Sequence, residues 1–401
     1  MNYPLSILNF QFDMLWNRNF IKAMLGNFLM FFAFYLTMPL LPLYLTDEFG
    51  ANKDTIGLVL SGFVVAALLV RPFSGFIVDN FPRKKVLMLC YFLFFIFFGG
   101  YIAATTLLMF AIVRTLHGFS LGAATVANST IAIDVLLPER RAEGIGYYGL
   151  SNNMAMALGP TVALWVYHII PDFNALFVLS LISAGIGFWV ISTIQSRVQV
   201  IPKRNEPLSL DRFLLLKGWR EGITVATFAM AYGILSTYLA IYGKEALGIT
   251  GGTGTYFMLL AAGLMSSRLI GSRTLRQGKI TQNAAVGVVI SLIGYTLFAG
   301  VSEMWAYYLS ALVIGLGNGH FFPAFQTMFI NLAPHTQRGT ANSTLLISWD
   351  LGIGLGVLLG GVVAEAFNYH AAFWLSVVAE VIGVLVFFVS VRSHFLRNKV
   401  R

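Results

Sequence analysis

Charged residues are scarce in this sequence: of its 401 residues, 11% are charged and 57% are hydrophobic. A soluble globular domain carries about a quarter charged residues, so this composition excludes that class and indicates a chain whose solvent is lipid. Cysteine is almost absent as well. The single Cys90 lies inside an apolar run, which excludes a disulfide framework and a cysteine metal site and indicates a packed hydrophobic side chain.

The first nineteen residues lack the pattern of a cleavable signal peptide, because Asp13 and Arg18 stand among scattered aromatic residues. We expect a short interfacial helix there, with an apolar face formed by Ile7, Phe10, Leu15 and Trp16. This segment is therefore predicted to lie at a membrane surface.

Long uncharged runs are abundant. A helix of about 20 apolar residues crosses a bilayer. We predict twelve such helices, at residues 20–45, 55–78, 85–105, 107–134, 143–169, 174–195, 222–243, 252–272, 282–301, 304–332, 340–366 and 371–391. The predicted fold class is an all-α, multi-pass membrane protein.

Positive charge is unevenly distributed over the predicted loops. The outer loops hold only Lys53 and Lys244 of the 26 Lys and Arg residues. The positive-inside rule then places both termini in the cytoplasm, and we expect a bacterial inner membrane. The formal net charge of +9 reflects this topology, so we expect lipid and no nucleic acid as a partner.

The chain reads as two halves of one design. Residues 197–220 form the longest polar stretch and are predicted to be a cytoplasmic linker between two six-helix bundles, residues 1–196 and 221–401. Sliding the second half back by 197 residues, without a gap, favours an internal duplication. The identical pairs are Arg71 and Arg268, Gly118 and Gly315, Gly122 and Gly319, Arg141 and Arg338, and Gly159 and Gly356.

A glycine, an acid and two basic residues follow one another at the cytoplasmic end of the second predicted span. They are Gly75, Asp79, Arg83 and Lys84, within RPFSGFIVDNFPRKK. Together with PLLPLYL at residues 39–45 and the duplicated halves, this pattern resembles the major facilitator superfamily, specifically its twelve-span drug/proton antiporter and sugar-efflux-like branch. The resemblance covers nearly the whole chain. It implies two pseudo-symmetric bundles with a midplane site between them and a monomeric protein.

The resemblance implies that Gly75, Asp79, Arg83, Lys84 and Arg141 form a conformational gate. A carboxylate at the end of one span can face the positive N-terminal end of a helix in the other half, which the resemblance implies begins near residue 339. Such contacts hold the cytoplasmic side closed in one state and break in the other.

The gate pattern departs from the family at three positions. Pro82 stands where the family usually has a turn glycine, and Asn80 where a basic residue is common. The position 197 residues after Asp79 is Arg276, so we expect one lock and not two. Asp134, at the inner end of the fourth span, is expected to pair with Arg140 or Arg141.

Two charges lie deep in predicted spans. Arg114, with His117 on the same helical face and Gly118 next along, resembles the family's intramembrane arginine signature. A charge near the bilayer centre costs about 2.5 to 3.5 kcal/mol, so we expect Arg114 to bind an anionic group or to stabilise a nearby carboxylate. Asp350 lies twelve residues past Arg338 and is the predicted proton carrier, since a carboxyl group removed from water can exchange protons.

Gly146, Gly159 and Pro160 in the fifth predicted span resemble the antiporter signature, in which glycines and a Gly-Pro pair kink the helix and allow close packing. The match is partial, because Ala155 and Ala163 occupy positions where the family has glycine. The signature is associated with exporters and favours efflux.

Polar and aromatic residues on spans one, four, seven and ten are candidates for substrate binding, because the resemblance places these spans around the cavity. The candidates are Arg114, His117, Asn318, His320, Gln326, Tyr232, Tyr238, Asn27 and Tyr35.

The function predicted from these patterns is a proton-coupled exporter of a small molecule (a drug, a sugar or a metabolite) that works by alternating access. The alternative is a proton-coupled importer of an anionic metabolite, with Arg114 as the substrate clamp. No cofactor or metal is expected, and the proton gradient supplies the energy. A membrane-embedded enzyme that uses His117 or His320 as a base is a third hypothesis, but the sequence has no nucleophile elbow and no HExxH motif. A receptor would need larger soluble segments than the central linker.

Overall fold

The structure is a computed structural model that describes residues 15–195, 209–249 and 254–400. These residues form helices and their connections, and no strand occurs among them. Most of the predicted interfacial helix, including Ile7 and Phe10, lies outside the described residues, as does linker segment 196–208.

In the part of the chain that the structure describes, twelve helices of 18 or more residues lie in the twelve predicted segments. The first six are α2 (Arg18–Thr37), α4 (Lys53–Asn80), α5 (Arg83–Ala103), α6 (Leu107–Asp134), α7 (Arg141–Ile169) and α8 (Phe173–Ser192). The others are α9 (Trp219–Leu247), α10 (Gly254–Arg276), α11 (Ile280–Gly300), α12 (Met304–Leu332), α13 (Arg338–Ala366) and α14 (Tyr369–Val386). Within the described residues, nine helical segments are long and apolar enough to cross a membrane. The all-α fold class is confirmed.

The first predicted span, residues 20–45, is two helices in the structure. Helix α2 ends at Thr37, and the short α3 (Leu41–Phe49) begins after the turn at residues 38–40. Pro39 and Pro42 explain the break, because proline lacks the N–H group that an uninterrupted helix needs and its ring clashes with the preceding turn. The chain ends in a π-helical turn (Phe387–Val391) and a short helix, α15 (Arg392–Asn398).

Helix boundaries in the two halves follow the 197-residue register. Helix α5 and helix α11 are offset by 197 residues at both ends, and so are α7 and α13. Helix pairing repeats as well, since α4 packs on α6 as α10 packs on α12, and α2 packs on α8 as α9 packs on α14. The internal duplication read from the sequence therefore describes the fold.

Glycine identities between the halves have a packing reason. A Cβ atom at Gly118 of α6 would overlap the backbone carbonyl of Phe63 on α4, and one at Gly315 of α12 would overlap that of Leu260 on α10. Phe63 and Leu260 are themselves 197 residues apart. Helices in lipid gain stability from close backbone approach, so both halves keep a small residue at the same crossing.

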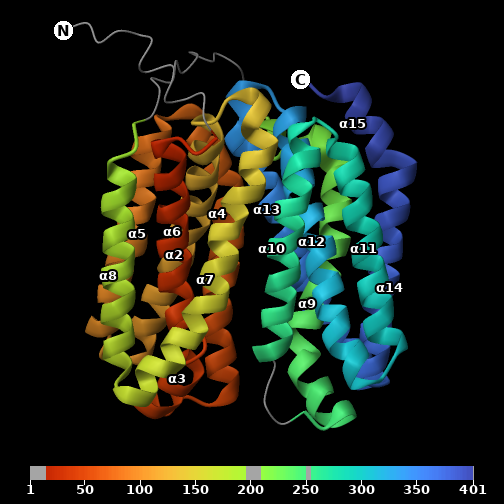
Figure 1. The fold of residues 1–401 in the computed structure, drawn as a ribbon. Helices are drawn as coiled ribbons and strands as arrows, with labels where there is room; N and C mark the ends of the chain where they lie inside the picture. Colours follow the sequence, from red (N-terminus) through yellow and green to blue (C-terminus); the bar gives the residue numbers. More distant parts are fainter. Residues whose placement is uncertain (1–14, 196–208, 250–253, 401) are drawn as a thin grey trace, which may run out of the picture. The chain divides into compact units, whose positions relative to one another are not determined.

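The chain divides into two compact units (Figure 1). One contains the described residues up to Pro138 and those from Ser151 to Ser209, and the other contains Glu139–Leu150 and the described residues from Leu210 onward. Helix α7 thus contributes its first turns to the second unit and its remainder to the first, a division that lies within a helix and not only at the linker.

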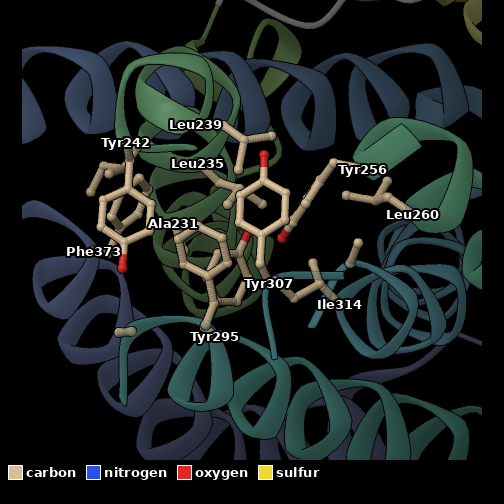
Figure 2. Close-up of a cluster of buried hydrophobic side chains, with 14 of the residues drawn as sticks. Ala231, Leu235, Leu239, Tyr242, Tyr256, Leu260, Tyr295, Tyr307, Ile314 and Phe373 are labelled. Carbon is tan, nitrogen blue, oxygen red and sulfur yellow. The ribbon is translucent and has the colours of Figure 1, made fainter. Parts of the chain in front are cut away.

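The core of the second unit is rich in tyrosine (Figure 2). The rings of Tyr256 and Tyr307 meet edge to face with centroids 4.8 Å apart, and those of Phe298 and Phe373 with centroids 4.7 Å apart. Edge-to-face contacts place the positive ring edge on a negative ring face, so they hold helices α10, α11, α12 and α14 together without a hydrophobic driving force.

Candidate functional site

A three-residue ion cluster joins the ends of α4, α5 and α6. Arg83, the first residue of α5, donates to Asp79 Oδ1 through Nη2 at 3.1 Å and pairs with Asp134 Oδ2 through Nη1. Arg83 and Asp79 are buried, at 8% and 6% exposure. Two carboxylates share one guanidinium here, an arrangement that the planar fork of arginine suits and a lysine does not.

Asp134 has a partner beyond the two that the sequence predicted, Arg140 and Arg141. Arg140 pairs with Glu143 at 3.0 Å, three residues along the chain, and Arg83 takes Asp134. The physical reason is proximity in the fold: the short α4–α5 turn brings Arg83 to the end of α6. Asp134 therefore contacts Arg83, one of the predicted gate residues.

The other predicted gate residues lie near this cluster in the chain. Lys84 donates from Nζ to the carbonyl of Ile194, just past the end of α8, where a cation is favoured by the helix dipole. Gly75 is buried in α4, one turn before Asp79, and Arg141 begins α7. Whether the gate closes on the helix that begins near Gly339 stays a prediction.

Arg114 on α6 lies in an aromatic setting at 3% exposure. Its guanidinium carbon is 4.0 Å from the centroid of the Phe63 ring, a cation–π contact, and Nη1 donates to the Tyr101 hydroxyl at 3.0 Å. Among the described residues Arg114 forms no ion pair, and its buried Nε has no hydrogen-bond partner. The cation is thus held by rings and one phenol.

His117 completes a row of three polar side chains. Its Nδ1 is 2.6 Å from the Tyr101 hydroxyl oxygen, and both residues are fully buried. The rings of Phe94 and Phe98 lie with centroids 4.6 Å from the imidazole. An apolar wall of this kind excludes water and strengthens electrostatic interactions inside it.

Sequence reasoning missed Tyr101. The signal that would have found it is the short connection between α5 and α6, because a hairpin of helices brings the last turn of α5 against the first turns of α6. An arginine one to two turns into α6 then reaches a polar group near the end of α5.

Asn27 is part of a second polar cluster in the first unit. Its Nδ2 donates to Ser151 Oγ at 2.9 Å, and Asn128 Nδ2 donates to Asn27 Oδ1 at 3.5 Å and to the Ala23 carbonyl at 3.3 Å. These groups join α2, α6 and α7. Asn128 and Ser151 were not predicted, because neither stands in a motif.

Gly159 lies at a close approach of α7 to α2. A Cβ atom there would be 2.5 Å from Tyr35 Cβ and 3.2 Å from the Tyr35 carbonyl carbon. Pro160 follows it inside the helix. Tyr35 is half-buried and its ring packs on that of Phe34, with centroids 5.2 Å apart. Tyr35 thus takes part in the packing of α2 against α7, and its role in substrate binding stays a prediction.

Gly146 has a different environment. A Cβ atom there would meet no heavy atom of the described residues within 4 Å, and its contact is made by its carbonyl oxygen, which accepts from Arg268 Nη1 at 2.9 Å. Gly149, about one turn further along α7, is packed more tightly than Gly146, since a Cβ atom there would meet the Arg268 guanidinium.

Four of the five predicted substrate residues of the second unit contact four different neighbours. His320 Nδ1 lies 2.9 Å from Asn283 Oδ1, and Gln326 Nε2 donates to Asn342 Oδ1 at 2.8 Å. The remaining contacts are Tyr238 with the Val357 carbonyl at 2.7 Å and the ring of Tyr232 with that of Trp349 at 5.8 Å, while Asn318 is buried on α12. His320 and Gln326 thus face α11 and α13 from one helix.

Three of the acidic residues in the helices of the second unit, Asp350, Glu221 and Glu380, differ in how far they are buried. Asp350 is half-buried on α13, whereas Glu221 and Glu380 are fully buried. Glu221 Oε1 pairs with His394 Nδ1 at 2.9 Å, and Glu380 Oε1 accepts from Ser291 Oγ at 3.1 Å. The proton-carrying role of Asp350 stays a prediction.

Comparison with known proteins gives the family. The model of the Major Facilitator Superfamily matches residues 23–334 and 284–400. The chain belongs to the major facilitator superfamily. It is therefore a membrane transporter and not an enzyme.

Relatives of this transporter share its length. The MFS-type transporter YhhS of Escherichia coli (strain K12) is 24% identical over 360 residues, which is 86% of each chain. That of Salmonella paratyphi C is 23% identical with the same coverage.

Solved structures of the superfamily share the fold. The human organic anion transporter MFSD10 has a TM-score of 0.81 at 17% identity over 92% of this chain and 99% of its own. The transporter FucP in its outward conformation has a TM-score of 0.74 at 13% identity, over 92% and 97% of the two chains. A bacterial homologue of ferroportin has a TM-score of 0.75 at 14% identity, over 92% and 98%.

Membership in this superfamily confirms the resemblance read from the gate pattern. The substrate-facing assignments stay predictions, because the described contacts of Arg114, His117, His320 and Gln326 are with other side chains of the same unit.

Proposed function

We propose that this transporter is a proton-coupled exporter of a small molecule, placed in the bacterial inner membrane with both termini in the cytoplasm. The observation that carries the direction of transport is the close approach at Gly159, where a Cβ atom would be 2.5 Å from Tyr35. This is the packing that the antiporter signature of Gly159 and Pro160 implies. The positive-inside distribution of Lys and Arg supports the topology.

Proton coupling in this proposal uses Asp350 and Arg114. Asp350 takes up and releases the proton, and substrate and proton compete through their different affinities for inward-open and outward-open states. The Arg83 cluster biases that equilibrium, because two carboxylates on one guanidinium, of which Asp79 is buried, favour the state that supplies further positive charge.

A second candidate is import of an anionic metabolite together with protons. The observation that favours it is the buried Arg114 guanidinium, which forms no ion pair within the described part of the chain. A buried cation without an acid is costly, and an anionic ligand would offset that cost.

Everted membrane vesicles distinguish the two. Respiration acidifies their lumen, so an exporter exchanges lumenal protons for added substrate and raises the lumenal pH reported by a quenched dye. The test substrates are compounds that are more toxic to an efflux-deficient host lacking this protein than to the same host producing it. Release of preloaded substrate from the vesicles would instead indicate the importer, and an Asp350→Asn variant with undiminished proton exchange would remove Asp350 from the mechanism.

A further inference from the structure

The hydrogen bonds among Arg114, Tyr101 and His117 have a fixed direction. Arginine can only donate, so the Tyr101 oxygen accepts from Nη1 at 3.0 Å. The single hydroxyl proton of Tyr101 is then left for His117 Nδ1, 2.6 Å away. Nδ1 is therefore the acceptor, and the imidazole is neutral with its own proton on Nε2.

The row formed by Arg114, Tyr101 and His117 carries one positive charge, which belongs to Arg114. His117 is enclosed by Phe63 from α4 and by Phe94, Phe97, Phe98 and Tyr101 from α5. Tyr101 and Arg114 are the only titratable or charged groups that face it among the described residues. No carboxylate within that part of the chain neutralises the cation.

A proton on His117 is opposed by two features of this arrangement. It would place a second positive charge two hydrogen bonds from the Arg114 guanidinium, in a site walled by aromatic rings. It would also turn Nδ1 into a donor, so that the Tyr101 oxygen would face two donors and its own proton would lose its acceptor.

An anion at Arg114 removes both objections. It neutralises the guanidinium, and its oxygens offer the acceptor that the Tyr101 proton needs. The Arg114 Nε is buried and unused among the described residues, and an N–H edge of guanidinium matches the two oxygens of a carboxylate.

We propose that a carboxylate group of the transported molecule at Arg114 and a proton on His117 are taken up together, with Tyr101 reversing its hydrogen bond between them. The Nδ1 lone pair of His117 accepts the proton, the Tyr101 hydroxyl turns toward the carboxylate, and the net charge of the site returns to one. Because Arg114 is 3% exposed, the ligand enters in another conformation of the cycle. This inference rests on the second candidate function, anion transport.

Coupling of this kind is reciprocal. If the anion favours the proton, the proton favours the anion by the same factor, typically about 5- to 150-fold. Anion affinity therefore rises by a factor in this range as pH falls through the titration of His117.

Titration calorimetry on the purified full-length protein in nanodiscs tests the proposal. Benzoate, gluconate and citrate serve as probes, each measured in buffers of different protonation enthalpy, so that the protons taken up per bound anion are obtained directly. We expect uptake of about one proton per anion by the wild type and less than about a tenth of that by His117→Gln, whose amide oxygen still accepts from Tyr101. His168→Gln, an exposed histidine near the end of α7, is the matched control and retains wild-type uptake.

Three results overturn the inference: none of the probes binds the wild type, an anion binds without proton uptake, or His117→Gln retains the uptake. If His117→Gln does not fold, Tyr101→Phe replaces it and is expected to lower the uptake while Arg114 remains. The vesicle assay tests anion import independently of this inference. If the protein does not import anions, neither the wild type nor His117→Gln will release preloaded anion from the vesicles.

Discussion

The Arg83 guanidinium lies 3.1 Å from Asp79 across the turn between α4 and α5 and also pairs with Asp134 at the end of α6. One side chain therefore holds three helix ends at the place where the family signature of glycine, acid and basic residues stands. Its removal takes away the cation that the two carboxylates share, and of these Asp79 is buried.

Arg83→Gln is expected to lower the stability of the protein by about 3–5 kcal/mol, the cost of breaking a buried ion pair by removing its cation. The apparent melting temperature of the purified protein measures the effect. Lys85→Gln, an exposed cation two residues along the chain, is the control and should be neutral. Adding Asp79→Asn should restore part of the loss. Equal melting temperatures for the Arg83 and Lys85 variants would show that the cluster does not stabilise the fold.

Gly159→Ala is expected to disrupt the crossing of α7 and α2, because the new methyl group would lie 2.5 Å from Tyr35 Cβ. Overpacking of this kind costs about 1–3 kcal/mol, which we expect to reduce both expression and substrate efflux from whole cells. Gly146→Ala on the same helix adds the same methyl group in open space and serves as the control. Full efflux by Gly159→Ala would contradict the role given to this contact.

Asn283 binds His320 twice, donating from Nδ2 to its carbonyl at 2.9 Å while Oδ1 lies 2.9 Å from its Nδ1. Asn283→Leu is expected to cost about 1–3 kcal/mol, since it removes the side-chain donor to the His320 carbonyl and leaves the buried ring nitrogen without its partner. Gln282→Ala, at the exposed position next to it, is the control. Thermal unfolding of the two variants decides, and a shift no larger for Asn283→Leu than for the control would argue against this pair.

The C-terminal helix α15 is fastened to the second unit by the buried Glu221, which pairs with His394 at 2.9 Å. His394→Ala removes that partner, so we expect faster amide hydrogen exchange throughout α15 and a loss of about 1–3 kcal/mol, the cost of leaving a buried hydrogen-bonding group unpaired. Ser393→Ala, exposed and adjacent, should leave exchange unchanged. Exchange of α15 that is identical in both variants would mean that Phe395, which is 2% exposed, holds the helix without the contact between Glu221 and His394.

Local sequence was enough to predict the number and place of the long helices, because apolar runs of bilayer length can only satisfy their backbone groups as helices in lipid. It failed at the first span, where Pro39 and Pro42 end α2 and start α3 within a run that hydropathy alone joins together. The duplication register was readable for a related reason. Gly118 and Gly315 are kept small by the same helix crossing in both halves.

The partners of the charged groups could not be predicted from the sequence in this way. Asp134 was expected to pair with Arg140 or Arg141, and its pair with Arg83, fifty-one residues away, was not predicted; nor was the pair of Arg140 with Glu143. Tyr101 carried no motif, yet it is the acceptor for Arg114. Such pairs depend on which side chains meet when helices pack, and neither composition nor spacing contains that information.

The sequence by itself determined the solvent, the class, the duplication and the family, since each follows from the kinds of residue and their spacing along the chain. Only the tertiary structure decided that Arg114 is held by a phenol and an aromatic face, that Arg83 serves two acids, and that His320 and Gln326 turn to different helices. The physical reason is that an isolated helix fixes the direction of its side chains but not their neighbours, and a buried charge acquires its function from its neighbours.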